Sequence, residues 1–224
     1  MNELLNIDCM EYMKDIPDNY FDLAIVDPPY GININNNMGR RKGQKHSGHK
    51  KIKWDNSPPD KEYFDELFRI SKNRIIWGGN YFDLPLTGAW IFWDKLMPAE
   101  MSFSQGELAW MTFGNTIRKV VIQHSGIKNK DNRNKIHPTQ KPIALYKWLL
   151  KNYAKPGWKL FDSHSGSGSF RIAAYDMGFD LISCEIDKDY CRDNEARFQN
   201  HIKQAELFSG EEIQELTYKE LLNE

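Results

Sequence analysis

The stretch "WKLFDSHSGSGSFRIAAYDMGFDLISCEID" (158–187) decides the fold. An apolar run is followed by a glycine-rich turn, a helical segment, a second apolar run and an acidic residue. Gly166 and Gly168 let the backbone approach a bound group closely, and the N-terminus of the following helix favours an anionic group. Glu185 ends the second run, where a carboxylate can accept hydrogen bonds from two ribose hydroxyls. The pattern predicts a β-α-β unit that binds a nucleoside cofactor; the alternative is a tight turn without a ligand.

The glycine turn lacks two motifs that bind nucleotides, and this narrows the choice of cofactor. The dinucleotide fingerprint requires a third glycine where this chain has Arg171, and no Gly-Lys-Ser/Thr sequence follows the glycines, as it does in phosphate-binding loops of ATPases. S-adenosyl-L-methionine has a ribose and an adenine but no pyrophosphate, so it needs the turn and the acidic residue without the full fingerprint. The sequence therefore favours S-adenosyl-L-methionine as the cofactor.

Outside this unit, short apolar runs alternate with segments of helical periodicity. We predict strands at 22–27, 73–78, 88–93, 117–122, 158–162 and 180–185, and helices at 60–71, 142–154, 168–177, 187–203 and 211–223. This alternation predicts an α/β fold with a mostly parallel central sheet and helices on both faces, in a single domain over 1–224. Four tryptophans in apolar runs are expected in the core: Trp77, Trp90, Trp93 and Trp110.

Composition narrows the classes of protein. Hydrophobic residues make up 40% and charged residues 27%, as in an ordinary globular protein. No run approaches the roughly 18 apolar residues of a membrane span, and the N-terminus lacks the basic-then-apolar pattern of a signal peptide. Cys9, Cys184 and Cys191 have no C-x-x-C spacing, which predicts reduced thiols and no metal site. We expect a cytoplasmic protein that requires neither membrane nor metal.

The net charge of −1 conceals a segregation of charge. Residues 28–53 contain no acidic residue and carry Arg40, Arg41, Lys42, Lys45, Lys50, Lys51 and Lys53. The stretch 115–135 carries Arg118, Lys119, Lys128, Lys130, Arg133 and Lys135 against Asp131, whereas 206–224 is acidic. Two basic stretches on a near-neutral chain predict contact with a polyanion; the alternative is that both are solvated loops. We expect a mobile basic loop at 33–57 and a small segment at 114–136 that recognises this polyanion.

A second motif, "DPPY" (27–30), follows the apolar run 23–26. That run predicts a strand buried on both faces, and Pro28 and Pro29, which cannot donate ladder hydrogen bonds, end it. The simplest interpretation of Asp27 is a cap on the turn. In a parallel sheet, however, the carboxyl end of this strand and the glycine turn can border the same crevice.

Four motifs follow one another along the chain: "DPPY" (27–30), "HPTQKP" (137–142), "FDSHSGSGS" (161–169) and "CEID" (184–187). Together they resemble a DNA amino-methyltransferase, and their order, with the glycine turn last, resembles the β class of adenine-specific enzymes. The segments 74–82 and 93–110 resemble the phage and prophage members. The resemblance covers nearly the whole chain. It departs at Ser163 and His164, where the family usually has Pro and Phe.

The resemblance implies a Rossmann-like S-adenosylmethionine-dependent methyltransferase fold with permuted motif order, and methyl transfer to the 6-amino group of adenine in DNA. The catalytic set is Asp27, Pro28, Pro29 and Tyr30: the Asp27 carboxylate and the Pro28 carbonyl would accept from the amino group, while Tyr30 stacks on the extruded base. The expected cofactor-binding residues are Asp8, Cys9, His137, Thr139, Lys141, Asp162, Ser163, Ser165, Gly166, Gly168, Glu185 and Ile186. The expected DNA-binding residues are Arg40, Arg41, Lys42, Lys50, Lys51, Arg118, Lys119, Lys128 and Arg133.

Several alternatives stay open at this point. Asp8 would contact the cofactor's adenine by resemblance, but on local sequence it fits a helix cap equally well. Lys141 could pair with the methionyl carboxylate. Cytosine N4 methylation is the nearest rival reaction, although the resembling cytosine enzymes usually have Ser in place of Asp27. Enzymes that methylate RNA or protein glutamine typically have Asn there. A catalytically silent DNA-binding module is a rival of another class, and a homodimer is compatible with the resemblance.

Overall fold

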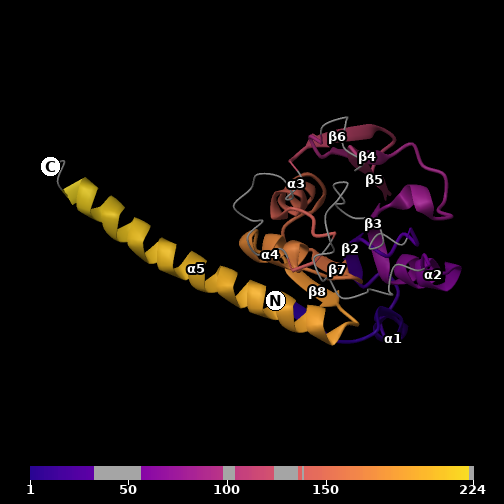
Figure 1. Ribbon diagram of the computed structural model, residues 1–224, viewed down its shortest axis with the longest axis horizontal. Coiled ribbons are helices and arrows are strands. Elements are labelled where there is room, and N and C mark those ends of the chain that lie inside the picture. Colours follow the sequence, from indigo (N-terminus) through magenta and orange to yellow (C-terminus); the bar gives the residue numbers. More distant parts are fainter. Residues whose placement is uncertain (33–56, 98–103, 124–135, 138, 222–224) are drawn as a thin grey trace, which may run out of the picture.

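The computed structural model describes residues 1–32, 57–97, 104–123, 136–137 and 139–221, with side chains as far as residue 205. These residues form one eight-stranded sheet with helices packed against it (Figure 1). The strands are β1 Asn2–Leu5, β2 Phe21–Val26, β3 Ser71–Trp77, β4 Trp90–Asp94, β5 Gly106–Met111, β6 Ile117–Val121, β7 Lys159–Asp162 and β8 Asp180–Cys184. The helices are α1 Cys9–Lys14, α2 Lys61–Ile70, the short 3-10 helix η2 Gly79–Tyr81, α3 Ile143–Tyr153, α4 Ser169–Asp176 and α5 Lys188–Leu221.

The order of the strands across the sheet is β1-β8-β7-β2-β3-β5-β4-β6. Neighbouring strands are parallel except where β5 is involved, because β5 runs against both β3 and β4. The prediction of a mostly parallel α/β sheet is confirmed. Since β5 is reversed, its first residues lie at the edge where the parallel strands end: Glu107 is opposite Trp93, the penultimate residue of β4.

The winding of the sheet changes direction between β2 and β7. The connection through α2 leads from β2 to β3 on one side, whereas the connection through α4 leads from β7 to β8 on the other. The carboxyl ends of strands at such a point border the crevice where ligands of doubly wound sheets bind. Asp27 directly follows β2 and Asp162 ends β7, so the topology brings the two sequence motifs to one place.

Both faces of the sheet are covered, as predicted. Successive residues of β2 point to opposite faces: Ile25 packs with the cluster that contains α3 and α4, and Val26 with the cluster that contains α1 and α2. Figure 1 shows α3 and α4 on the side away from α1 and α2. The expected tryptophan core is also seen, because Trp77, Trp93 and Trp110 are buried and Trp90 is half-buried.

The predicted boundaries agree with the observed ones to within two residues for six strands and for α2, α3 and α4. The sequence analysis missed β1, α1 and β5. It was wrong about two separate C-terminal helices, because α5 runs without interruption from Lys188 to Leu221 and extends past the body of the sheet (Figure 1). No proline lies between the two predicted segments, so a helix can continue through them. Within the described residues, no helix has the length and apolar character needed to cross a membrane.

Candidate active site

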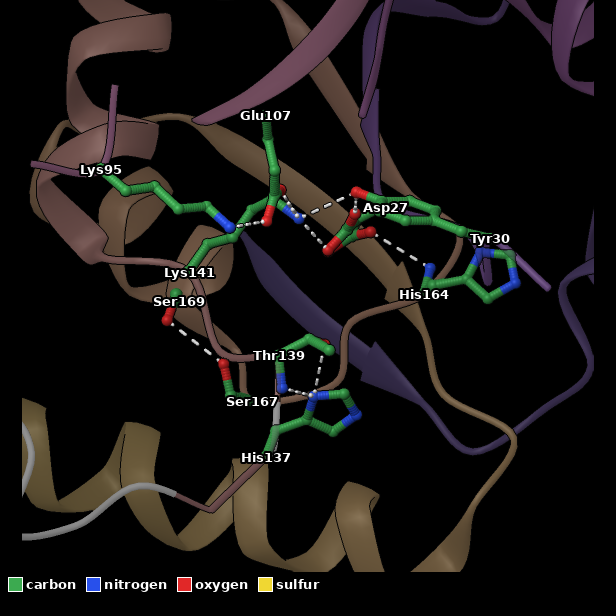
Figure 2. A network of polar contacts seen from close by, with 11 residues as sticks. Asp27, Tyr30, Lys95, Glu107, His137, Thr139, Lys141, His164, Ser167 and Ser169 are labelled. Atoms are coloured by element: carbon green, nitrogen blue, oxygen red, sulfur yellow. Dashed lines mark hydrogen bonds and ion pairs between the residues drawn. The ribbon is translucent and has the colours of Figure 1, made fainter. Parts of the chain in front are cut away.

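The Asp27 carboxylate sits at the carboxyl end of β2 and is held by two neighbours. Tyr30 donates its hydroxyl hydrogen bond to Asp27 Oδ1 at 2.6 Å, and the Lys141 ammonium pairs with Oδ2 (Figure 2). The Asp27 side chain is 19% exposed, so part of it stays accessible from outside. Each carboxylate oxygen has two lone pairs, and both oxygens therefore keep acceptor capacity for a substrate amino group.

The Tyr30 ring is packed against other aromatic and backbone groups. It stacks on Tyr81 of η2, with ring centroids 5.1 Å apart and planes inclined by 16°, and it contacts Phe82 edge-to-face with ring centroids 6.0 Å apart. Gly78, with φ +68°, makes room for it, because a Cβ there would lie 2.2 Å from Tyr30 Cε1. Tyr81 is 48% exposed. The expected base-stacking ring is thus one member of a tyrosine pair that the sequence analysis did not identify.

Two further charged residues reach the site from the far half of the sheet. Glu107 of β5 lies between two ammonium groups, with Lys95 Nζ 2.5 Å from Oε1 and Lys141 Nζ 3.1 Å from Oε2 (Figure 2). Burial would raise the pKa of Glu107, but Lys141 and Lys95 outweigh burial and hold it at about 2. Burial would lower the pKa of Lys141, but Asp27 and Glu107 raise it above its ordinary value. The sequence analysis had no signal for Glu107, which lies in a strand that it missed.

Glu185, which follows β8, is tied to the glycine turn. Its Oε2 accepts a hydrogen bond from the Gly166 amide at 2.8 Å, and its Oε1 accepts one from the Asp187 amide at 2.9 Å. Burial raises the pKa of Glu185, and the two amide hydrogen bonds oppose that rise only in part. The neighbouring Ile186 is 64% exposed and offers an apolar surface beside the carboxylate. This arrangement suits a sugar hydroxyl pair next to a flat, apolar base.

The glycine turn is anchored to α5 by Asn194. The Asn194 amide donates to Ser165 Oγ at 2.9 Å and to the Gly166 carbonyl at 3.2 Å. Gly168 begins α4 with φ +73°, and a Cβ there would lie 2.3 Å from Asn194 Oδ1. The sequence analysis attributed the lack of a side chain at Gly168 to a ligand; the space is filled by Asn194. Gly166 is the more open glycine, with the His137 ring 3.7 Å from its Cβ position.

Asp162, Ser163 and His164 fill the start of the turn. Asp162 is 4% exposed and accepts a hydrogen bond from the His164 amide at 3.1 Å. Burial raises the pKa of Asp162 to about 8; that hydrogen bond opposes the rise, and the charges of Asp27 and Glu185 add to it. Ser163 Oγ contacts Tyr63 Oη at 2.7 Å and His164 Nδ1 at 2.8 Å, and burial lowers the pKa of His164 to about 4. The unusual Ser-His pair is therefore a neutral packing unit with Tyr63.

His137 of the "HPTQKP" segment lies beside the glycine turn, with its ring 3.7 Å from the Cβ position of Gly166. Thr139 Oγ1 is 3.0 Å from His137 Nδ1, and the His137 ring contacts the Tyr190 ring edge-to-face at 4.6 Å. Asp8 is the N-cap of α1, accepting from the Met10 amide at 2.8 Å, which is the capping role left open by its sequence. Burial raises the pKa of the Cys9 thiol to about 12, so this residue stays a neutral thiol.

The residues present fit a cationic nucleoside. Asp27, Asp162 and Glu185 place three carboxyl groups around one glycine turn; burial raises the pKa of Asp162, the charges of Asp27 and Glu185 add to that rise, and Lys141 opposes it only in part. A ligand that carries a sulfonium and an ammonium group would supply positive charge, and its ribose would meet Glu185. Within the described ranges, no group of three His, Cys, Asp or Glu side chains could hold a metal ion.

Most of the residues expected to bind DNA fall outside the described residues: Arg40, Arg41, Lys42, Lys50, Lys51, Lys128 and Arg133. The same holds for most of the 33–57 loop and much of 114–136. Arg118 and Lys119 lie on the exposed edge strand β6, and Lys119 Nζ pairs with Asp94 Oδ2 at 2.9 Å.

Comparison with known proteins links this geometry to a family. The family model N6_N4_Mtase, described as DNA methylase, matches residues 71–196, more than half of the chain. YubD of Escherichia coli (strain K12), which is named as a methylase, is 23% identical over 222 residues, covering 88% of this chain and 90% of YubD.

Two solved structures illustrate the shared fold. The M1.HpyAVI–SAM complex has a TM-score of 0.58 and 18% identity, and the match covers 88% of this chain and 100% of that one. The PvuII DNA methyltransferase, named cytosine-N4-specific, also has a TM-score of 0.58, with 14% identity and coverage of 87% and 85%. At these identities the likeness shows the fold, and it includes an enzyme named for cytosine.

Proposed function

The chain belongs to the N6_N4_Mtase family of DNA methylases, and from this premise we propose that it methylates the 6-amino group of adenine in DNA. Family membership makes it an S-adenosylmethionine-dependent DNA methyltransferase that acts on an amino nitrogen. The observation that supports the proposal most directly is the position of Asp27, at the carboxyl end of β2 and facing the glycine turn that follows β7.

Asp27 and Pro28 would prepare the amino group for reaction. The lone pair of an exocyclic amino nitrogen is delocalised into its ring, so this nitrogen is a weak nucleophile. Two acceptors aimed at its N–H bonds favour a pyramidal nitrogen and make the lone pair available. The Asp27 carboxylate keeps lone pairs for this task, and the Pro28 and Pro29 rings fix the direction of the Pro28 carbonyl and leave no amide donor there to compete. A preorganised charge at this position also stabilises the positive charge that develops on the nitrogen.

Tyr30 would hold the base once it has left the duplex. Stacking on an aromatic side chain contributes ~1–3 kcal/mol per base, and enzymes that react with a base extrude it from the helix. Because Tyr30 is fixed by its hydrogen bond to Asp27 and by its contact with Tyr81, the ring and the carboxylate are positioned together. A base stacked beside Tyr30 would therefore present its amino group to Asp27.

The glycine-turn corner would bind the cofactor, which supplies a methyl group on a cationic sulfonium. We assign Glu185 to the ribose, Ile186 to the adenine face, and Asp162 to a cationic group of the methionyl end. Ser163, Ser165, Gly166 and Gly168 shape the turn. The roles of Asp8, Cys9, His137, Thr139 and Lys141 toward the cofactor stay predictions, because the Asp8 side chain caps a helix and the Lys141 ammonium lies between two carboxylates.

The choice between adenine and cytosine rests on Asp27. The resembling cytosine-N4 enzymes usually have Ser at this position, whose neutral hydroxyl is a weaker acceptor than a carboxylate. A negatively charged acceptor therefore favours adenine as the substrate of this chain. The basic stretches 28–53 and 115–135 would contact the phosphates on either side of the extruded base, with Arg118 and Lys119 on β6 as the described part of that surface.

Replacement of Asp27 by Ala tests the proposal. The variant should bind S-adenosylmethionine nearly as well as the wild type but lose methyl transfer to DNA by ~10²–10³ or more, since one preorganised electrostatic partner typically contributes that much. Asp22→Ala is the matched control, because it removes a carboxylate from the opposite end of the same strand. Single-turnover transfer of a labelled methyl group to unmethylated DNA gives the rate. An Asp27→Ala rate above about a tenth of the wild-type rate would refute the assigned role, since the loss would then fall well short of the ~10²-fold minimum.

A further inference from the structure

An alternating row of charges runs from the far half of the sheet to the catalytic carboxylate. Lys95 pairs with Glu107, Glu107 pairs with Lys141, and Lys141 pairs with Asp27 (Figure 2). Tyr30 ends the row by donating a hydrogen bond to Asp27. The four residues come from the end of β4, from β5, from the loop before α3 and from the end of β2. With all four ionised, their formal charges sum to zero.

Lys141 is the member that depends most on its neighbours. Its side chain is 4% exposed, and a buried ammonium group is costly unless opposite charges and hydrogen bonds compensate it. Tyr30 Oη lies 3.3 Å from Lys141 Nζ, and the Trp77 ring lies under the ammonium at 5.3 Å. These neutral groups add little charge compensation. Asp27 and Glu107 are therefore the two groups that keep Lys141 ionised.

Asp27 cannot serve both Lys141 and a substrate without competition. When a substrate amino group donates a hydrogen bond to Asp27, the Asp27 carboxylate is shared between that group and the Lys141 ammonium. Glu107 does not face this competition, because it lies behind Lys141 and its Oε2 has no aligned hydrogen bond other than the contact with the ammonium. A carboxylate at this position is suited to compensate the charge of Lys141 while Asp27 accepts from a substrate.

We propose that Glu107, itself held by Lys95, is a positioning residue for methyl transfer: it keeps Lys141 as an ammonium ion clamped on Asp27, so that the catalytic carboxylate keeps its orientation toward the amino group. This inference rests on the proposed function of Asp27. Glu107 touches neither substrate nor cofactor in this role. Glu107 affects methyl transfer only by keeping Lys141 protonated and paired with Asp27.

The titration of Lys141 gives the proposal its test. The titratable groups that contact Lys141 or interact with its charge are Asp27, Tyr30, Glu107 and Asp162. Tyr146 lies near the carboxyl groups of Asp27 and Glu107, and Lys95 lies beyond Glu107. Glu107→Gln removes one opposite charge and keeps the shape of the side chain. A neighbouring opposite charge shifts a pKa by about 1–3 units, so Lys141 should lose its proton at a pH lower by about that amount. Lys95→Met is the matched control, because it breaks the other ion pair of Glu107 but leaves the Glu107 charge on Lys141.

Two measurements on the full chain separate this proposal from the proposed function. The first is the pH dependence of kcat for methyl transfer at saturating cofactor and DNA. The alkaline limb of Glu107→Gln should lie about 1–3 pH units below that of the wild type, whereas Lys95→Met should keep it in place or move it upward. The second is an NMR titration of labelled lysines, in which the Lys141→Met variant identifies the Lys141 signal. This titration requires no methyl transfer, so its result does not depend on which base is the substrate.

The outcomes are distinct. A lower titration midpoint for Lys141 in Glu107→Gln, together with a shifted kcat profile and unchanged cofactor affinity, supports the proposal. A kcat profile that keeps its shape, or a Lys95→Met variant that shifts as far downward as Glu107→Gln, overturns it and leaves Glu107 as a packing residue. If the Lys141 midpoint moves but the wild type methylates cytosine, the proposed substrate fails while the anchoring role stands.

Discussion

Asp162→Asn is expected to change how the stability of the protein depends on pH. In the folded chain burial raises the pKa of Asp162 from 3.8 to about 8, against the hydrogen bond from the His164 amide. Between these two values the folded state holds a proton that the unfolded state has lost, so the free energy of unfolding falls as the pH rises. Asn is neutral at all pH values and its Oδ1 can still accept from the His164 amide.

The size of the effect follows from the two pKa values. One pKa unit corresponds to about 1.4 kcal/mol, so between roughly pH 5 and pH 8 the wild type should lose on the order of 3 to 4 kcal/mol relative to Asp162→Asn. Below about pH 5 the free energy of unfolding should depend less on pH, because the carboxyl group of the unfolded chain also takes up a proton there. Titration of the six histidines is common to both proteins and cancels in the difference.

Urea denaturation at a series of pH values, in the absence of cofactor, measures this difference. Asp22→Asn is the control, because its ionised form is favoured instead: burial would raise the pKa of Asp22, but hydrogen bonds from Lys72 and the Lys159 amide lower it. The difference in free energy of unfolding between Asp22→Asn and the wild type should stay constant between about pH 5 and about pH 8. If Asp162→Asn also ran parallel to the wild type, Asp162 would be ionised in the folded protein, and the argument for an uncompensated acidic corner would fail.

Three further variants test other parts of the site. Glu185→Ala should weaken S-adenosylmethionine binding severely in calorimetry, since each hydrogen bond to a charged acceptor contributes ~1.5–3 kcal/mol; wild-type affinity in the folded variant would rule out the ribose assignment. Gly168→Ala should lower Tm by more than Gly157→Ala, because both have positive φ but only Gly168 faces a contact at 2.3 Å, whereas nothing lies within 4 Å of the Gly157 Cβ position; equal losses would argue against that contact. Tyr81→Ala should weaken DNA binding about tenfold through loss of stacking support for the base-binding ring, while Tyr81→Phe should keep it; an equal loss in both would show that the hydroxyl and not the stacked ring matters.

The sequence predicted the parts of the fold that carry strong periodicity. The strand before Asp27 and the strands of the unit from 158 to 187 contain short apolar runs, and that unit also has glycines at positive φ. The approach of the two motifs to each other follows from the rule for parallel sheets. The strand β5 was missed because its Leu108 is exposed and Glu107 interrupts the apolar pattern at the edge of the site.

The sequence analysis missed some residues of the site and misassigned the partners of others for one physical reason. Glu107, Lys95 and Tyr81 act through contacts with residues distant in sequence, and nothing in their local pattern marks such contacts. The space beside Gly168 was attributed to a ligand because the local motif could not show that Asn194 of α5 fills it. Lys141 had a charge partner in the prediction, but its observed partners come from β5 and from the end of β2.

Identification of the methylated nucleoside tests the central claim most directly. Unmethylated DNA would be incubated with the protein and S-adenosylmethionine labelled in its methyl group, then digested to nucleosides and separated by liquid chromatography with mass detection. We expect label in 6-methyldeoxyadenosine for the wild type and for Asp22→Ala, and at least ~10²-fold less in the same time for Asp27→Ala. Label in 4-methyldeoxycytidine would contradict the assignment of adenine, and no label in any nucleoside of the wild-type digest would contradict the assignment of the chain as an active DNA methyltransferase.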